Sequence, residues 1–131
     1  MSAITFSAGD TNLDVYAAAN KIGMAVPVTG GEDICYGGYA TGGAHSILGA
    51  RYGFAADLIL ELTVVTPNGR VVLANSCQNS DLFWALRGGG GATFGVIVSF
   101  TMALYQDEPT SILVSGRTYF YPCHWIYFSY R

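Results

Sequence analysis

The sequence has few charged residues. Aspartate, glutamate, lysine and arginine make up 11% of its 131 residues, whereas they make up roughly a quarter of a typical soluble domain. Hydrophobic residues make up 51%, which is more apolar surface than one domain of this length normally hides. We therefore expect a large cofactor, a partner or further parts of the same polypeptide to cover the excess.

Basic residues are scarce and scattered, with six Lys and Arg against nine Asp and Glu, for a formal net charge of −3. Binding of a polyanion needs clustered positive charge, so we expect no nucleic-acid partner. Long apolar runs are missing too, because the stretches 58–65 and 95–105 fall well short of the roughly 20 residues that cross a bilayer. We expect no membrane partner, and the opening residues predict no secretory leader.

Cysteine is nearly absent as well. The three cysteines, Cys35, Cys77 and Cys123, are odd in number and widely spaced, so they form neither a metal-binding pair nor a disulfide framework. The sequence predicts no metal site, and it leaves the cellular compartment undetermined.

What is present is a mixture of helical and extended patterns. A helix is expected over Asp10–Gly23, where Leu13, Tyr16, Ala17 and Asn20 recur at helical spacing. Its cap is expected to be Asp10, Thr11 or Asn12. A strand is expected over Met24–Val28. The stretch Gly30–Gly43 holds six glycines in fourteen residues, which favours a loop that approaches something closely.

The second half predicts a hairpin and a further strand. Leu58–Val65 and Arg70–Ala74 are rich in Leu, Ile and Val, and a turn-forming Thr-Pro-Asn-Gly separates them. A short helix capped by Ser80 is expected over Asp81–Leu86, followed by a strand over Gly95–Leu104. These elements do not alternate strictly, so the pattern favours an α+β fold with an antiparallel sheet and helices on one side.

The glycine-rich stretch does not match the common nucleotide-binding motifs. Gly37–Gly43 does not fit G-x-G-x-x-G and lacks the Lys and Ser or Thr of a phosphate-binding P-loop, so NAD and ATP sites of those types are disfavoured. Free backbone N–H groups in such a loop can lie against a pyrophosphate or a flat ring, with stacking from Tyr39 or Tyr52. A purely structural loop is the alternative.

Four ordered blocks give the sequence a family resemblance. Residues 37–46 and 52–57 resemble the GGY-x-x-GGGHS and YGLAAD blocks of berberine bridge enzyme-like FAD oxidoreductases, a branch of the vanillyl-alcohol oxidase (VAO) superfamily. Residues 64–70 are similar to that family's VVT-x-x-GR hairpin. Residues 79–97 resemble its N-x-DLFWALRGGGGG-x-FGV signature.

The resemblance implies the second subdomain of a PCMH-type FAD-binding domain, in a flavin-dependent oxidoreductase that oxidises an alcohol, sugar or related small molecule with dioxygen as acceptor. FAD and a small-molecule substrate are the implied partners of the complete enzyme. The residues implied to contact FAD are Gly37, Gly38, Tyr39, Gly42, Gly43, Gly53 and Val96. The family's catalytic base lies in another domain, so no catalytic residue is nominated here.

The family correspondence extends over residues 1–105, and residues 106–131 form a divergent aromatic-rich tail. The chain therefore resembles part of the enzyme, and on its own it is expected neither to oxidise a substrate nor to hold FAD tightly. The alternative is a non-catalytic remnant or interaction module that does not hold flavin.

Several residues depart from the family pattern or have a structural interpretation. Ala44 replaces the third glycine of GGG, where its Cβ would crowd a ligand. In some relatives a cysteine attaches the flavin; Cys35 falls late in that pattern, and a small buried residue is its alternative role. His45 is interpreted as a loop residue and Asp57 as an anchor of the cofactor loop. Phe83 and Trp84 are expected in the core, and Arg87 at a helix end.

Overall fold

The computed structural model describes residues 2–91 and 93–107. Its strands are β1 (Ser2–Ser7), β2 (Met24–Ala25), β3 (Ile59–Val65), β4 (Val71–Asn75) and β5 (Val96–Gln106). Its helices are α1 (Asn12–Asn20), α2 (Tyr36–Thr41), α3 (Gly49–Tyr52), the 3-10 helix η1 (Ala55–Leu58) and α4 (Ser80–Leu86). The aromatic-rich part of the predicted tail lies outside the described residues.

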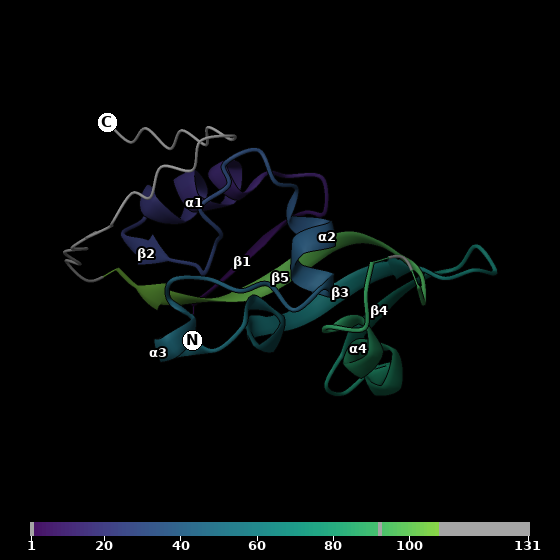
Figure 1. Cartoon of the computed structure of the whole chain (residues 1–131). Coiled ribbons are helices and arrows are strands. Elements are labelled where there is room, and N and C mark those ends of the chain that lie inside the picture. The colour runs from purple at the N-terminus through teal and green to yellow at the C-terminus, as the bar shows by residue number, and fades with distance from the viewer. Residues whose placement is uncertain (1, 92, 108–131) are drawn as a thin grey trace, which may run out of the picture.

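The strands form one antiparallel sheet in the order β1-β5-β3-β4, and β2 pairs with the far end of β5. The long β5 therefore runs between the first strand of the chain and the hairpin of β3 and β4 (Figure 1). The predicted hairpin and final strand are confirmed to within two residues at each end. Strand β1 was not predicted from the sequence.

The two faces of the sheet differ in polarity. One cross-strand row is Phe6, Phe100, Leu62 and Ala74, all of them buried. The adjacent row on the opposite face is Thr5, Thr101, Glu61 and Asn75, which are half-buried or exposed. Buried side chains of α1, α2 and α4 join the cluster that contains the first row. The α+β fold, with helices on one side of an antiparallel sheet, is thus as predicted.

Helix α1 begins at one of the three predicted caps. The Thr11 hydroxyl accepts a hydrogen bond from the Asp14 N–H, and the Asp14 carboxylate accepts one from the Thr11 N–H in return. This reciprocal pair satisfies two backbone donors that the helix leaves free. The buried side of α1 consists of Asn12, Val15 and Ala19, whereas Leu13 and Tyr16 of the predicted pattern are about half exposed.

The expectation of an irregular loop over Gly30–Gly43 is wrong for its second half, which forms α2. Two of the six helical residues are glycine, which disfavours a helix in isolation. The side chains of Tyr36 and Ala40 are fully buried, and the Tyr36 ring packs edge-on against Phe6 at 4.8 Å between ring centroids. Burial on the sheet therefore outweighs the poor helix propensity of glycine.

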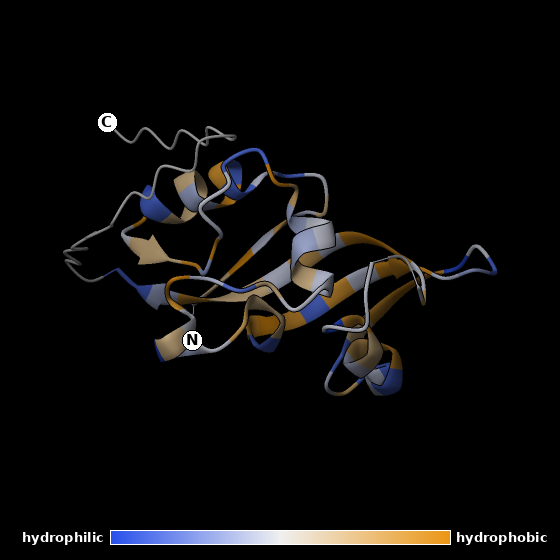
Figure 2. Cartoon of the chain, in the orientation of Figure 1, coloured by the Kyte–Doolittle hydropathy of each residue, from blue (hydrophilic) through white to orange (hydrophobic). Residues whose placement is uncertain are grey.

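The connection between β3 and β4 is the tight turn that its sequence predicts. The Gly69 N–H donates to the Thr66 carbonyl at 2.8 Å, and Gly69 has φ +79°, a conformation that favours glycine. Figure 2 shows this hydrophilic connection between two mostly hydrophobic strands. Ser80 is not the cap of α4: Asn79 occupies that position with φ +49°, and its side-chain amide donates to the Leu73 carbonyl.

Candidate functional site

Helix α2 carries three of the residues expected to contact FAD, and one of them explains why the helix lies so close to the sheet. A Cβ on Gly37 would lie 2.8 Å from the Ala8 carbonyl oxygen at the end of β1. The Gly37 N–H donates to that same oxygen at 3.0 Å. Only a glycine permits this approach, so Gly37 has a packing role whether or not a ligand is bound.

The other glycines of the segment leave an open surface. A Cβ on Gly38 or on Gly43 would meet nothing within 4 Å, and Gly43 has φ +105°. Gly42 caps the C-terminal end of α2. Bare backbone over open space is what a large flat or anionic ligand requires for close contact. These glycines therefore fit the predicted cofactor, although Ala44, with φ +61°, adds a side chain beside them.

The two tyrosines considered for stacking already have partners within the chain. The Tyr39 hydroxyl donates to the His45 carbonyl at 2.6 Å, its ring packs edge-on against Tyr36, and burial raises the pKa of its phenol. The Tyr52 ring stacks on Tyr105 with 4.0 Å between centroids. The Tyr39 side chain is thus fixed by contacts within residues 36–45, and the Tyr52 ring is stacked on a residue at the end of β5.

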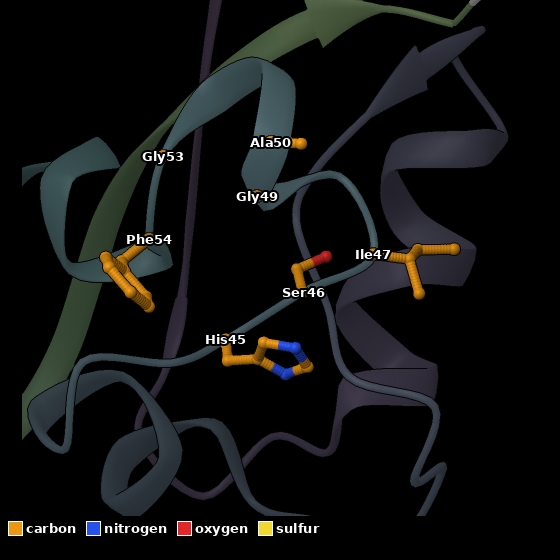
Figure 3. Close-up of a pocket in the computed structure, with 7 residues that line it drawn as sticks. All are labelled: His45, Ser46, Ile47, Gly49, Ala50, Gly53 and Phe54. Carbon is orange, nitrogen blue, oxygen red and sulfur yellow. The ribbon is translucent and has the colours of Figure 1, made fainter.

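A pocket of about 360 Å³ lies beside this segment (Figure 3). Its lining comes from α3 and from the loops on either side of it, and consists of His45, Ser46, Ile47, Gly49, Ala50, Gly53 and Phe54. The buried Ser46 hydroxyl donates to the Val28 carbonyl at 2.9 Å and so fixes the loop next to the segment after β2. His45 is exposed at the rim.

Asp57 anchors the turn in which it lies, and the hydrogen bond to the segment of Gly43 comes from the backbone of its neighbour Ala56. Its carboxylate accepts a hydrogen bond from the Phe54 N–H at 3.1 Å and closes the first turn of η1. Gly53 precedes this turn with φ +84°, and a Cβ there would lie 3.1 Å from the carboxylate. The Ala56 N–H donates to the Gly43 carbonyl at 3.2 Å. The structure therefore joins the segments that contain Gly43 and Gly53.

A second glycine segment approaches the first and was missed in the sequence. The Gly90 N–H donates to the Thr41 carbonyl at 3.0 Å, which places the turn after α4 at the C-terminal end of α2. A Cβ on Gly91 would lie 3.4 Å from the Thr41 hydroxyl oxygen. The signal was present in the run of four glycines at 88–91, but no pattern in the sequence links that run to Thr41.

Val96 is the member of the predicted set that lies apart. It is the first residue of β5, pairs with Val65 and is 60% exposed. The Tyr36 ring at the start of α2 lies over Phe100, four residues further along the strand, which corresponds to roughly 13 Å. Contact with both places therefore requires an elongated ligand.

Two predictions about side chains near the site are wrong. Cys35 is exposed just before α2, so it is not the small buried residue considered in the sequence, and Cys77 is exposed as well. Trp84 is 76% exposed, whereas Phe83 is buried as expected. Within residues 2–91 and 93–107, no three His, Cys, Asp or Glu side chains gather to hold a metal ion. Nor does any described helix have the length and apolar character of a membrane span.

The antiparallel sheet with helices on one side defines an α+β domain, and glycines without side-chain neighbours lie at and after the end of α2. The family model of the FAD binding domain matches residues 1–75. This chain belongs to that family, among the VAO/PCMH-type FAD-linked oxidoreductases.

Three relatives illustrate the membership. An uncharacterised FAD-linked oxidoreductase of Arthroderma benhamiae is 46% identical over 111 residues, which are 84% of this chain and 19% of that protein. A VAO-type flavoprotein oxidase of Thermothelomyces thermophilus is 46% identical over 80% of this chain and 18% of its own length. The solved structure of a BBE-like protein of Physcomitrella patens has a TM-score of 0.76 and 30% identity over 79% of this chain and 23% of its own. The chain thus spans about a fifth of the length of these relatives.

Proposed function

We propose that this chain is the FAD-binding portion of a flavin-dependent oxidoreductase that oxidises an alcohol, a sugar or a related small molecule with dioxygen as acceptor. The observation that carries the proposal is the open glycine surface, where a Cβ on Gly38 or Gly43 would meet nothing within 4 Å. Membership of the FAD binding domain family supports it. The name of one relative, a flavoprotein oxidase, supports dioxygen as the acceptor.

The part of this chain in the reaction is to bind and orient the cofactor. We place FAD along the backbone of the predicted residues, which are Gly37, Gly38, Tyr39, Gly42, Gly43, Gly53 and Val96. Bound FAD supplies the redox chemistry, in which a hydride leaves the substrate and dioxygen is reduced to hydrogen peroxide. The hydrogen bond from the Tyr39 hydroxyl to the His45 carbonyl holds the Tyr39 side chain in place beside these glycines. No described residue is nominated as the base that removes the substrate proton.

A second candidate function is a remnant or interaction module that does not hold flavin. It is favoured by one observation, namely that Tyr39 and Tyr52, which were considered for stacking on a ligand, already contact other rings of the chain. The resemblance assigns the pyrophosphate loop and the substrate domain to other parts of the enzyme. We therefore expect the 131 residues alone to bind FAD weakly and to oxidise nothing, because fewer contacts must offset the same cost of ordering the ligand.

A matched pair of glycine substitutions tests the site. Gly43 and Gly69 both have positive φ, and a Cβ on either would meet nothing within 4 Å, so both alanine variants carry similar backbone strain. Only Gly43 belongs to the residues that we propose to contact FAD. Titration of FAD, followed by quenching of flavin fluorescence, is expected to show weak saturable binding that Gly43→Ala abolishes and Gly69→Ala leaves intact.

The outcomes separate the two candidates. Absence of saturable binding, or an equal loss in both variants, would remove the FAD site from this chain and support the non-binding module. The chain is also incubated with FAD, desalted and examined by its visible spectrum. Flavin retained near stoichiometric level, with peroxide released on addition of an alcohol or a sugar, would show instead that the 131 residues form a complete catalyst.

A further inference from the structure

A second cavity, of about 420 Å³, lies between η1 and the end of α4. Its lining consists of Asp57, Trp84, Ala85, Arg87, Gly88 and Gly89. None of the residues predicted to contact FAD contributes to it. The side chains that line this cavity, and not the predicted FAD contacts, therefore determine which ligand it can bind.

Arg87 brings a positive charge to the cavity lining. Its Nε atom is buried and has no hydrogen-bond partner in the part of the chain that the structure describes. The guanidinium carbon lies 4.4 Å from the centroid of the Phe83 ring, a contact that gives Nε no acceptor. Arginine stays protonated at every relevant pH, and a buried donor without an acceptor is costly. Because Arg87 is the cation among the residues that line the cavity, the cavity favours a ligand that bears negative charge.

Trp84 and the glycines give the cavity its shape. The Trp84 side chain is 76% exposed although it lies on a helix that packs on the core. Exposed indole rings offer a flat apolar surface on which planar groups stack. Gly88 follows with φ +114°, and a Cβ there would meet nothing within 4 Å, so the cavity stays open at this residue. The ligand therefore combines an anionic group with a planar apolar one.

Asp57 determines which anion fits. Its carboxylate lines the same cavity and is held by the Phe54 N–H. A second negative charge nearby repels a ligand in proportion to the ligand's own charge. A carboxylate with a single charge is therefore favoured over a phosphate ester with nearly two. The planar fork of an arginine also matches the two oxygens of a carboxylate.

We propose that this cavity binds a small carboxylate that carries a planar apolar group. The carboxylate pairs with the Arg87 guanidinium, and the planar group lies against the Trp84 indole. The site does not depend on the proposed flavin site, so it is tested without FAD.

Benzoate is the probe, because it has one carboxylate on one flat ring. The experiment uses the 131-residue chain with Trp125→Phe, so that Trp84 is the single tryptophan. We expect benzoate to quench the Trp84 fluorescence in a saturable manner. Arg87→Met should weaken binding by roughly tenfold or more, as the loss of a charged hydrogen bond predicts. Asp57→Asn should tighten binding by about two- to fivefold, because it removes the repelling charge and keeps an acceptor for Phe54.

Controls separate a site from general charge and stacking effects. Arg51→Met removes an equal charge elsewhere and should leave the benzoate affinity unchanged. Benzamide, which is flat but uncharged, and phenyl phosphate should each bind more weakly than benzoate. If circular dichroism shows that Arg87→Met is unfolded, Arg87→Lys replaces it, and it too should weaken binding because it lacks the fork.

Three results would overturn the proposal. These are quenching that does not saturate, an affinity that Arg87 substitution leaves unchanged, and tighter binding of phenyl phosphate than of benzoate.

Discussion

Ala44 occupies a backbone conformation that suits glycine better. It has φ +61° and a buried side chain, and its carbonyl accepts a hydrogen bond from the Ala55 N–H at 3.0 Å. A left-handed conformation costs a residue with a Cβ about 1–2 kcal/mol. The berberine bridge enzyme-like pattern has glycine at this position, so this chain retains the turn and carries the strain.

Ala44→Gly should stabilise the protein. We expect the free energy of unfolding to rise by roughly 0.5–1 kcal/mol, since relief of the strain exceeds the added freedom of glycine in the unfolded chain. Urea denaturation of both proteins measures the difference. Ala40→Gly is the control, because Ala40 lies in the middle of α2 and is fully buried. That variant should be less stable, and a loss of stability in Ala44→Gly would contradict the strain argument.

The roles of single residues were predictable where they depend on near neighbours. Asp57 was expected to anchor its loop, and its partner Phe54 is three residues away. Trp84 and Cys35 were assigned to the interior, and both are exposed. Their exposure depends on which sides of α4 and α2 the rest of the chain covers. That is a property of tertiary packing, and hydrophobicity at one position does not encode it.

Helix α2 has adjacent glycines that face opposite surroundings. A Cβ on Gly37 would lie 2.8 Å from the Ala8 carbonyl oxygen and 3.1 Å from the Ala8 Cβ, whereas a Cβ on Gly38 would meet nothing within 4 Å. One glycine permits the helix to reach the sheet. In the absence of a ligand, Gly38 only lowers the stability of the helix.

Alanine substitutions in this pair should have opposite effects. Gly37→Ala should lower the free energy of unfolding by about 1–3 kcal/mol through overpacking. Gly38→Ala should raise it by about 0.5–1 kcal/mol through better helix propensity. Thermal unfolding followed by circular dichroism distinguishes them. A shift of both melting temperatures in the same direction would mean that the close contact between α2 and β1 is not as described.

The helices and strands that could be predicted from the sequence are those marked by nearby turn residues, capping residues or regular apolar spacing. The hairpin of β3 and β4 follows from apolar strands and the turn at Pro67-Asn68-Gly69. Helix α1 follows from a capping residue near Thr11 and from the helical spacing of the residues after it. Strand β1 was overlooked, because six residues at the start of the chain carry no turn or repeat that marks them. Helix α2 was taken for a loop, since its stability comes from the burial of Tyr36 on the sheet.

At the scale of the whole molecule, the sheet exposes apolar side chains at one end. Val71 and Val96 both pair with Val65, so all three point to the same face, and Leu73 follows two residues after Val71 on β4. The exposed fractions of Val71, Val96 and Leu73 are 68%, 60% and 41%. Strand β4 is also an edge of the sheet. Apolar edges promote association between molecules.

Val71→Lys should reduce self-association of the chain. A charge on an exposed edge strand opposes pairing with another copy, and a surface substitution changes stability by no more than about 0.5 kcal/mol. Sedimentation velocity over a range of concentrations measures the effect. Ile22→Lys serves as the control, because Ile22 is 64% exposed but lies between α1 and β2 and not on the edge strand β4. An equal reduction in both variants would indicate a general effect of charge.

The sequence alone does not predict which distant segments come together to form the candidate site. The predicted contact residues come from α2, the turn after α3 and the start of β5. The hydrogen bond between Gly90 and Thr41 joins residues 49 positions apart in the chain. A run of glycines in a sequence shows where the backbone carries no side chains. It does not show which two runs lie next to each other in the fold. The family resemblance grouped the predicted contact residues, but it did not indicate that Gly90 meets Thr41.

The pairing of β1 with β5 has a consequence for synthesis on the ribosome. Ser7 pairs with Ser99 and Ser2 with Leu104, so the first described strand waits for the last described strand before it finds its place in the sheet. Until then the hairpin of β3 and β4 is the largest piece of sheet that can form. Contacts so distant in the chain slow folding, so β1 stays unpaired until β5 has been made.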